Sequence, residues 1–292
     1  MDATLFVQAG CELGESPMCH AERNSIWWAD IEAGKFFECS LLTKKIKSWQ
    51  VPQRLSLLVQ CAGDSNILLL AVADGLLQFN ITTGEFKRVL FLEEKVDNNR
   101  CNDGACDAKG RLWLGTMDIN CTAGAGKLYC INSDLQVQVK IEPTDISNGI
   151  CWSVLQDRMY YIDSTTYQVK SYFFDVGTSE IIFDKTVINI PPQMGMPDGM
   201  AIDEEGMLWI ASWGGFAVNQ WNPATGEMME TIVLPVPNVT SCVFGGLKMD
   251  RMFITTARAG LSAADLERYP LSGSIFTASP RVKGCNKHKC SI

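Results

Sequence analysis

Histidine is nearly absent from this sequence, and its scarcity excludes several common kinds of active site. The 292 residues include two histidines, His20 and His288. A zinc site with three histidine ligands and an HExxH helix are therefore excluded. A Ser–His–Asp triad would depend on His20 alone, and there is no GxSxG turn, P-loop or GxGxxG segment. These absences disfavour a serine nucleophile and leave metal chemistry with oxygen ligands as the main possibility.

The chain also lacks the features that direct proteins to membranes or to nucleic acids. No apolar run reaches the ~18 residues that a transmembrane helix needs. The N-terminal segment has no basic region of the kind found in signal peptides. With 25 basic and 33 acidic residues there is no basic stripe for nucleic acid. We therefore expect a cytoplasmic protein, monomeric or weakly dimeric, without membrane or nucleic-acid partners.

Six strand-like apolar runs recur along the chain at intervals of 41 to 49 residues. They begin at Ile26, Ile67, Leu112, Met159, Leu208 and Met252. A polar residue lies 10 or 11 residues before each run. These polar residues are Glu15, Ser56, Asn102, Asn148, Asp198 and Ser241. Short strands repeating about every 45 residues are typical of propeller blades, whose equivalent positions converge on one axis, so the six polar residues are predicted to surround one point.

The predicted fold is all-β: a six-bladed β-propeller with four-stranded antiparallel blades around a central channel that contains a metal. Apolar residues alternate with a period close to two, and helical periodicity is confined to residues 261–270. No linker divides the chain, so residues 1–292 are predicted to form one domain. Because propellers close their ring to protect sheet edges, a strand around Leu5–Gln8 is expected to pair with blade six.

Three of the converging residues are candidate metal ligands. Glu15, Asn148 and Asp198 offer two carboxylates and an amide oxygen. This set suits Ca²⁺, Mg²⁺ or Mn²⁺, and zinc also accepts carboxylate oxygen. Taken singly, Asn-Gly and Asp-Gly are ordinary turn dipeptides. Their matching register in separate blades favours one divalent metal ion over three unrelated turns.

Blade three carries polar residues that are candidates for binding a substrate. Asn102 is either a fourth ligand or a donor to a substrate hydroxyl, and Asp103 is expected to brace the turn. Arg100, two residues earlier, could hold a polar or anionic ligand or form a structural ion pair. The residues alone leave both alternatives open.

The cysteines are predicted to be mostly reduced. Twelve are present, and several alternate with apolar neighbours in strand-like segments. Buried free cysteines behave as small hydrophobes. The tail holds Cys285 and Cys290 around a basic segment whose spacing matches no strong zinc pattern. Chelation and a disulfide remain open for this pair, and a flexible tail from about residue 285 is the prediction.

Several motifs in a fixed order resemble the regucalcin/gluconolactonase family, also called the senescence marker proteins. They are GESP (14–17), NNRCNDGACDAKGRLWLGTM (98–117), ISNGICWS (146–153), MYYIDS (159–164), PDGMAIDEEGMLWIA (197–211) and TSCVFGG (240–246). The resemblance runs from about residue 10 to Gly284 and implies lactone hydrolysis at an axial divalent metal. It implies that Glu15, Asn148 and Asp198 are metal ligands, that Arg100 and Asn102 contact substrate, and that Asp198 is also the general base.

The sequence departs from this family at two places near the expected site. Where many sugar-lactone members have an acidic residue after GTM, this chain has Asn120, with Asp118 nearby, which makes Asn120 a further substrate-binding candidate. The segment QMGMPDGM (193–200) makes part of the mouth less polar. The expected substrate is a sugar (aldono-) lactone such as gluconolactone. The alternatives are a phosphotriesterase or fluorophosphatase, and a non-catalytic calcium-binding regulatory propeller.

Overall fold

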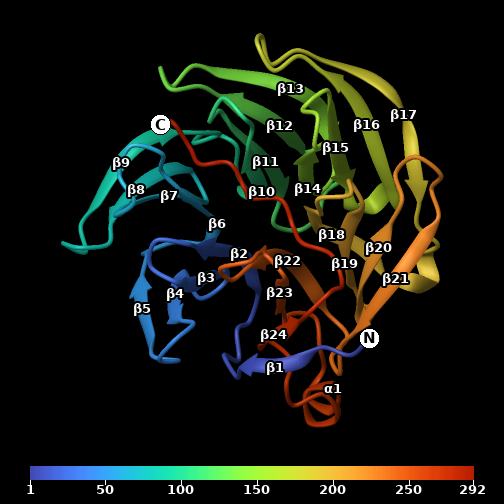
Figure 1. Cartoon of the computed structure of the whole chain (residues 1–292). Coiled ribbons are helices and arrows are strands. Elements are labelled where there is room, and N and C mark those ends of the chain that lie inside the picture. The colour runs from blue at the N-terminus through green and yellow to red at the C-terminus, as the bar shows by residue number, and fades with distance from the viewer.

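A computed structural model covers residues 1–292 and confirms the predicted six-bladed propeller. Six four-stranded antiparallel sheets form a ring around a central channel (Figure 1). Blade one comprises β2 (Gly14–His20), β3 (Ser25–Asp30), β4 (Lys35–Ser40) and β5 (Ile46–Gln50). Blade two comprises β6 (Leu55–Gln60), β7 (Ile67–Val72), β8 (Gly75–Asn80) and β9 (Phe86–Phe91). Blade three comprises β10 (Asn99–Cys106), β11 (Leu112–Asp118), β12 (Gly126–Ile131) and β13 (Val137–Thr144). Blade four comprises β14 (Ser147–Trp152), β15 (Arg158–Asp163), β16 (Gln168–Phe174) and β17 (Ile181–Asn189). Blade five comprises β18 (Met196–Ile202), β19 (Leu208–Trp213), β20 (Ala217–Trp221) and β21 (Met228–Val233). Blade six comprises β22 (Val239–Gly245), β23 (Arg251–Thr256), β24 (Ile275–Ala278) and β1 (Thr4–Val7).

The N-terminal strand closes the ring, as the sequence predicted. β1 pairs antiparallel with β24 as the outer strand of blade six, with Thr4 opposite Thr277 (Figure 1). The N-terminus also reaches blade five, where the Ala3 N–H donates to the Val233 carbonyl over 2.9 Å. One blade is therefore built from both ends of the chain, which joins the first and last repeats without leaving an open seam.

Apolar side chains between neighbouring blades form the core. One cluster joins blades one and two and contains Trp27 and Phe79, both fully buried, with Trp27 stacked on Trp49 at 5.2 Å between ring centroids. Another joins blades three and four around Trp113 and Trp152. Burial of each large apolar side chain stabilises a fold by about 1.5–3 kcal/mol. The alternating runs of the sequence therefore supply the contacts that hold one blade against the next.

Helices are few and short. The predicted helix within 261–270 is present as α1 (Ala263–Arg268), between β23 and β24, and a capping box formed by Ser262 and Asp265 begins it. Two single 3-10 turns, η1 (Ser164–Thr166) and η2 (Pro192–Met194), precede β16 and β18. None of the helices is long and apolar enough to cross a membrane.

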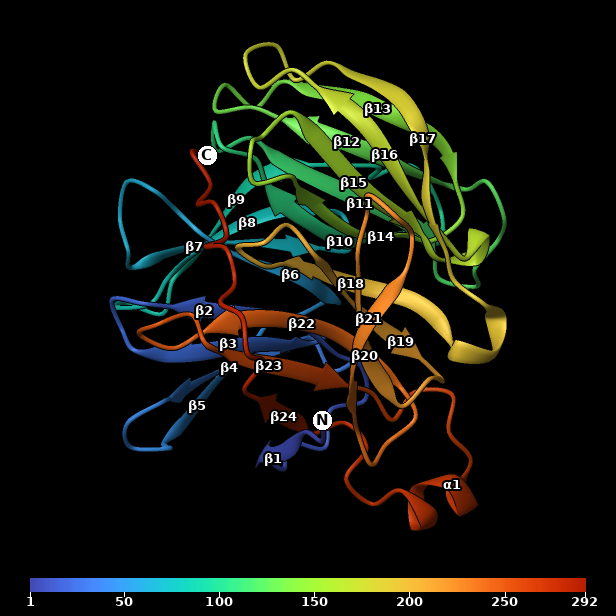
Figure 2. The same cartoon turned by 45° about the vertical axis from the view of Figure 1, so that its right-hand side comes forward.

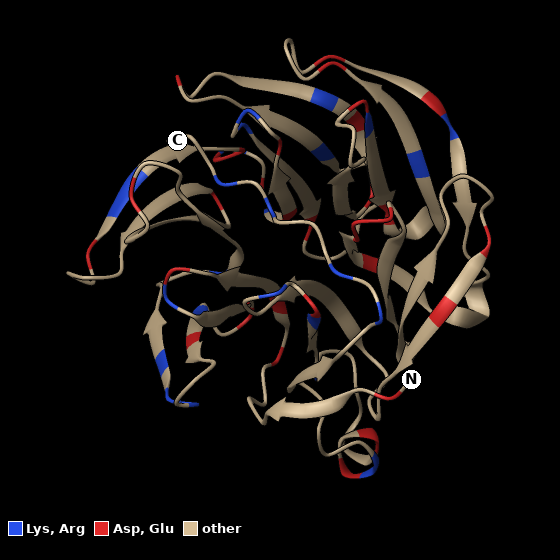
Figure 3. Ribbon diagram, in the orientation of Figure 1, with Lys and Arg blue, Asp and Glu red and all other residues tan.

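The C-terminal tail crosses one end of the central channel. It runs over the ring in Figure 2 and carries several of the basic residues coloured in Figure 3. The Cys290 N–H donates to the Gln60 carbonyl over 2.8 Å, and the Ser291 N–H donates to the Gly110 carbonyl over 2.9 Å. Cys290 is fully buried, and all twelve cysteines are free thiols. The segment predicted to be a flexible tail therefore lies hydrogen-bonded against blades two and three.

Candidate metal centre and active site

Each innermost strand is irregular at the polar residue that the sequence singled out. The inner strands are β2, β6, β10, β14, β18 and β22, and the pairing of each with its neighbour shifts register at or beside that residue. In β18, for example, the shift falls between Pro197 and Met200 and spans Asp198. A β-bulge bends its strand and redirects a side chain. The irregularity recurs in every blade, at the same place on the innermost strand.

The three predicted metal ligands and two of the three predicted substrate contacts share one pocket of about 170 Å³. Glu15, Asn102, Asn148 and Asp198 all line it, together with Arg100. Three of these four are buried, and Glu15 remains partly accessible from the pocket. We call these four residues the floor of the pocket. Ser56 and Ser241, which share the axial register, do not line it.

Negative charge is concentrated at the floor and is poorly compensated. Burial raises the pKa of the Glu15 carboxyl well above its ordinary value, and the neighbouring Asp198 and Asp103 carboxylates raise it further. Burial likewise raises the pKa of Asp198, with Asp103 as the main neighbouring charge. Asp103 has a raised pKa for the same reason, burial. Arg100 only partly opposes these shifts for Glu15 and Asp198, so the cluster lacks positive charge.

A divalent cation fits this floor. Two carboxylates would balance its charge, and Asn148 adds a neutral oxygen. The Asn148 amide is oriented because its Nδ2 donates to Ser164 Oγ over 3.1 Å. No three His, Cys, Asp or Glu side chains lie close enough together to hold one ion, so the donor set depends on this amide. Asp103 instead accepts a hydrogen bond from the Gly104 N–H over 2.7 Å, which braces the bulge.

Arg100 and Asn102 form a hydrogen-bonded pair on one side of the pocket. Arg100 Nη1 donates to Asn102 Oδ1 over 2.7 Å and to the Cys101 carbonyl over 2.9 Å. Asn102 Nδ2 in turn donates to the Ser147 carbonyl over 2.8 Å. Arg100 takes part in no salt bridge, so the structural ion pair considered from the sequence is absent. Its remaining N–H groups are free for a ligand.

The third substrate-binding candidate, Asn120, lies outside the pocket lining. It is exposed in the turn after β11, and its backbone N–H donates to Asp118 Oδ1 over 2.7 Å. The next residue, Cys121, lines the pocket instead. Cys121 has a left-handed backbone conformation, with φ of 58°. The turn conformation, which the sequence does not reveal, determines which of these neighbouring side chains faces the site.

Apart from Ser164, apolar residues form the rest of the lining, and sequence reasoning did not identify most of them. We call them the apolar rim: Leu13, Ile31, Met117, Ile146, Met196 and Trp213. Met196 and Trp213 are directly opposite each other on β18 and β19. Leu13, Ile146 and Met196 each precede a floor residue by two positions. This spacing was available in the sequence, because residues two apart on a strand share a face.

Close packing of neighbouring inner strands requires a glycine beside the floor. A Cβ at Gly149 would lie 2.7 Å from the Asp198 carbonyl oxygen and 2.8 Å from Met200 Cβ. We therefore expect Gly149→Ala to destabilise the protein by about 1–3 kcal/mol through overpacking, and to weaken activity by displacing Asp198. Urea unfolding and kcat/KM measure the two effects. Gly63→Ala is the matched control, since no atom lies within 4 Å of its Cβ position, and equal behaviour of both variants would contradict the prediction.

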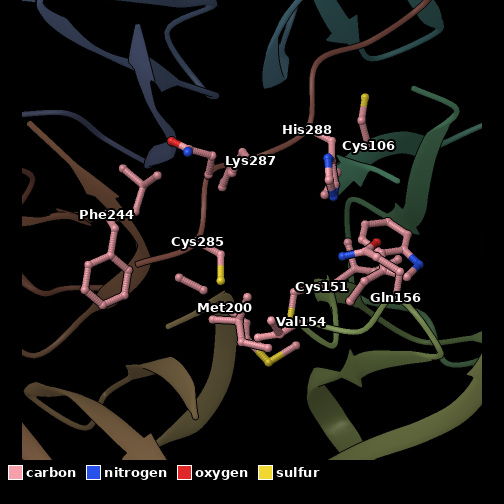
Figure 4. Close-up of a pocket in the computed structure, with 16 residues that line it drawn as sticks. Cys106, Cys151, Val154, Gln156, Met200, Phe244, Cys285, Lys287 and His288 are labelled. Carbon is pink, nitrogen blue, oxygen red and sulfur yellow. The ribbon is translucent and has the colours of Figure 1, made fainter. Parts of the chain in front are cut away.

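A second cavity of about 240 Å³ occupies the opposite end of the channel (Figure 4). It is lined by later residues of the inner strands, such as Cys151 and Met200, and by tail residues 285–288. Figure 4 shows Cys285 and His288 entering from the tail. No carboxylate lines this cavity. Of these two cavities, the first therefore has the oxygen ligands that a hard metal ion prefers.

Fold and site together define a six-bladed propeller with a carboxylate–amide cluster on its axis. The model of the SMP-30/gluconolactonase/LRE-like region matches residues 13–258. The chain therefore belongs to this family.

Individual relatives agree with that assignment along nearly the whole chain. Regucalcin of Oryctolagus cuniculus is 34% identical over 273 residues, which cover 91% of this chain and 90% of the relative. A luciferin-regenerating enzyme matches with a TM-score of 0.92 at 27% identity, covering 99% of this chain and 100% of its own. A calcium-binding protein, regucalcin from Agrobacterium tumefaciens, matches with a TM-score of 0.94 at 26% identity, covering 100% and 99%.

Proposed function

We propose that the protein is a metal-dependent hydrolase that opens the ring of a lactone. The observation that carries this proposal is that three floor residues, Glu15, Asn148 and Asp198, meet in one pocket where Arg100 only partly compensates the negative charge. Membership in a family that includes gluconolactonases supports lactone hydrolysis as the reaction. The scarcity of histidine supports catalysis without a serine–histidine pair.

The floor residues and Arg100 bind the ion, activate water or orient the substrate in this proposal. A divalent cation held by Glu15, Asn148 and Asp198 would supply Lewis-acid polarisation of the lactone carbonyl. Asp198 also takes the proton from the attacking water as general base. Arg100 and Asn102 orient the ring, and their mutual hydrogen bond holds both donors in place before substrate arrives.

The first substrate to test is an aldonolactone such as glucono-δ-lactone, because the family includes gluconolactonases. We expect hydrolysis to stop when the protein is stripped with a chelator and to return when one of Ca²⁺, Zn²⁺, Mg²⁺ or Mn²⁺ is added back. A pH-indicator assay measures the rate, and calorimetry measures which ion binds the stripped protein. Full activity after verified metal removal would refute the metal-dependent reaction.

The alternative hydrolase chemistry is tested by assaying a phosphotriester and a phosphorofluoridate beside the lactone. The relative kcat/KM values show which of these substrates the protein prefers.

A second candidate function is calcium binding without turnover. It is favoured by the structural match to a regucalcin that is described as a calcium-binding protein. The two functions differ in one measurable respect. Tight Ca²⁺ binding with no hydrolysis across the lactone and ester panel would support the regulator, and any metal-dependent turnover would support the enzyme.

A further inference from the structure

The layer of side chains next to the floor is almost entirely apolar. In blades one, three, four and five, the residue two positions before the floor residue is Leu13, Arg100, Ile146 and Met196 respectively, and all four line the pocket. The inner strands run away from this pocket, because their later residues line the opposite cavity. The residue two positions before each floor residue therefore lies nearer the mouth. Arg100 is the one polar member of this layer.

Few polar groups are free to receive the hydroxyls of a sugar. Asn102 accepts from Arg100 and donates one of its two amide hydrogens to the Ser147 carbonyl, which leaves one N–H for a substrate. Asn148 is bonded to Ser164, and Asn120 lies outside the lining. A substrate hydroxyl placed against the apolar rim would lose its hydrogen bonds to water without replacing them, and such losses are costly. A polar substituent can therefore be compensated on the Arg100 side of the pocket and by the hydroxyl of Ser164, which also lines it, but not along the apolar rim.

The dimensions of the pocket suit a single ring. An apolar cavity of ~150 Å³ accommodates benzene, and this pocket measures about 170 Å³. With the lactone carbonyl directed to the floor, a ring substituent must leave past the rim. Met196 and Trp213 form one side of that exit, and both are partly exposed. A substituent there would contact a thioether and an indole rather than hydrogen-bonding groups.

We propose that the apolar rim selects lactones with an apolar substituent over polyhydroxylated sugar lactones. This inference rests on the proposed lactone hydrolysis and specifies its substrate class. The preferred substrate has a five- or six-membered lactone ring, an alkyl or aryl substituent beside the rim, and at most one polar group on the Arg100 side. Met196 and Trp213 are the specificity-determining pair.

The test compares three lactones that share one ring size: δ-valerolactone, δ-nonalactone, which adds a butyl group, and glucono-δ-lactone. Each kcat/KM of the metal-loaded protein is divided by the spontaneous hydrolysis rate of that lactone in the same buffer. We expect δ-nonalactone to exceed each of the other two by about tenfold or more, the range that apolar pockets give for added methylenes. A preference for glucono-δ-lactone would overturn this inference while supporting the proposed function. Hydrolysis of none of the three would overturn both.

Two substitutions locate the preference in the rim. Met196→Gln keeps the length of the side chain and adds polarity, so the ratio of δ-nonalactone to δ-valerolactone should fall about tenfold. The δ-valerolactone rate of the same variant is the reference, so the ratio isolates the contact between residue 196 and the butyl group from any general change in the site. Met229→Gln, on the exposed outer strand β21 of the same blade, is the matched control and should change neither value. An unchanged ratio in folded Met196→Gln would contradict the assignment of this residue.

Binding provides a readout that is independent of catalysis. The cyclic ketones cyclohexanone and 3-butylcyclohexanone resemble the two lactones, with CH2 in place of the ring oxygen, but cannot be hydrolysed. Calorimetry on the protein without added metal should show about tenfold tighter binding of the butyl compound, and Met196→Gln should remove most of that difference. Equal binding of both ketones to the wild-type protein would overturn the inference.

Discussion

Replacing Asp198 by asparagine is expected to lower kcat/KM for lactone hydrolysis by about 10³-fold. General base catalysis alone contributes about 10²–10⁴ in rate. Asparagine has nearly the shape of aspartate, but it cannot accept a proton from water and removes one negative charge from the floor. The variant should therefore also bind the divalent cation more weakly, which calorimetry on the stripped protein measures. Steady-state rates at saturating metal separate the loss of the base from the loss of the ion.

Ser56→Ala is the matched control for this experiment. Ser56 occupies the same axial register in blade two, is buried, and makes one long hydrogen bond to the Ala71 carbonyl at 3.3 Å. It does not line the pocket, so its removal should leave kcat/KM within about twofold, as expected for a residue without contact to the substrate. If Asp198→Asn kept wild-type rates while remaining folded, Asp198 would be neither the base nor a required ligand.

The largest effect on stability is expected from Asp203→Ala. The Asp203 carboxylate is fully buried and accepts hydrogen bonds from Trp209 Nε1 at 2.8 Å and Gln220 Nε2 at 2.9 Å. It also accepts from the backbone N–H groups of Glu205 and Met207, at 3.0 and 2.9 Å. Removing the carboxylate leaves several buried donors without partners. Each unpaired donor costs about 1–3 kcal/mol of stability before the structure relaxes. We expect the free energy of unfolding to fall by about 3–5 kcal/mol, measured by urea denaturation.

Blade three offers an internal replicate of this arrangement. Asp107 is also fully buried and accepts from Trp113 Nε1 at 2.9 Å and Arg111 Nε at 2.6 Å, so Asp107→Ala should be comparably destabilising. Asp175→Ala is the negative control, because Asp175 is an exposed turn residue and its loss should change stability only slightly. Similar denaturation midpoints for Asp203→Ala and Asp175→Ala would show that the buried carboxylate does not anchor the turn.

These two aspartates illustrate what local sequence can predict. In DAKGRLW and DEEGMLW the same spacing separates Asp, Gly and Trp, and in both blades the Asp binds the turn and the following indole. Contacts over a few residues are set by local geometry, so the repeat carries them. The helix α1 was predictable for the same reason, from a local pattern. The closing strand β1 was predictable from a local pattern combined with the need to close the ring.

The apolar rim and the exclusion of Asn120 could not be predicted in this way. Asn120 and Cys121 are adjacent in sequence, and the left-handed conformation of Cys121 accompanies the turn in which only Cys121 reaches the pocket. Arg100 and Asn102 were identified as ligand-binding candidates, but their hydrogen bond to each other depends on the bulge between Cys101 and Gly104. Such outcomes depend on backbone distortions of a residue or two, which composition and periodicity do not encode.

The sequence by itself determined the six-bladed architecture and the convergence of Glu15, Asn148 and Asp198, because a repeat with a fixed period places equivalent residues on one axis. Only the tertiary structure decided which of the axial positions face one pocket, how apolar its mouth is, and where the tail lies. The physical reason is that these properties arise between blades. Side chains separated by about 50 residues or more meet there, and bulges and close contacts set their directions.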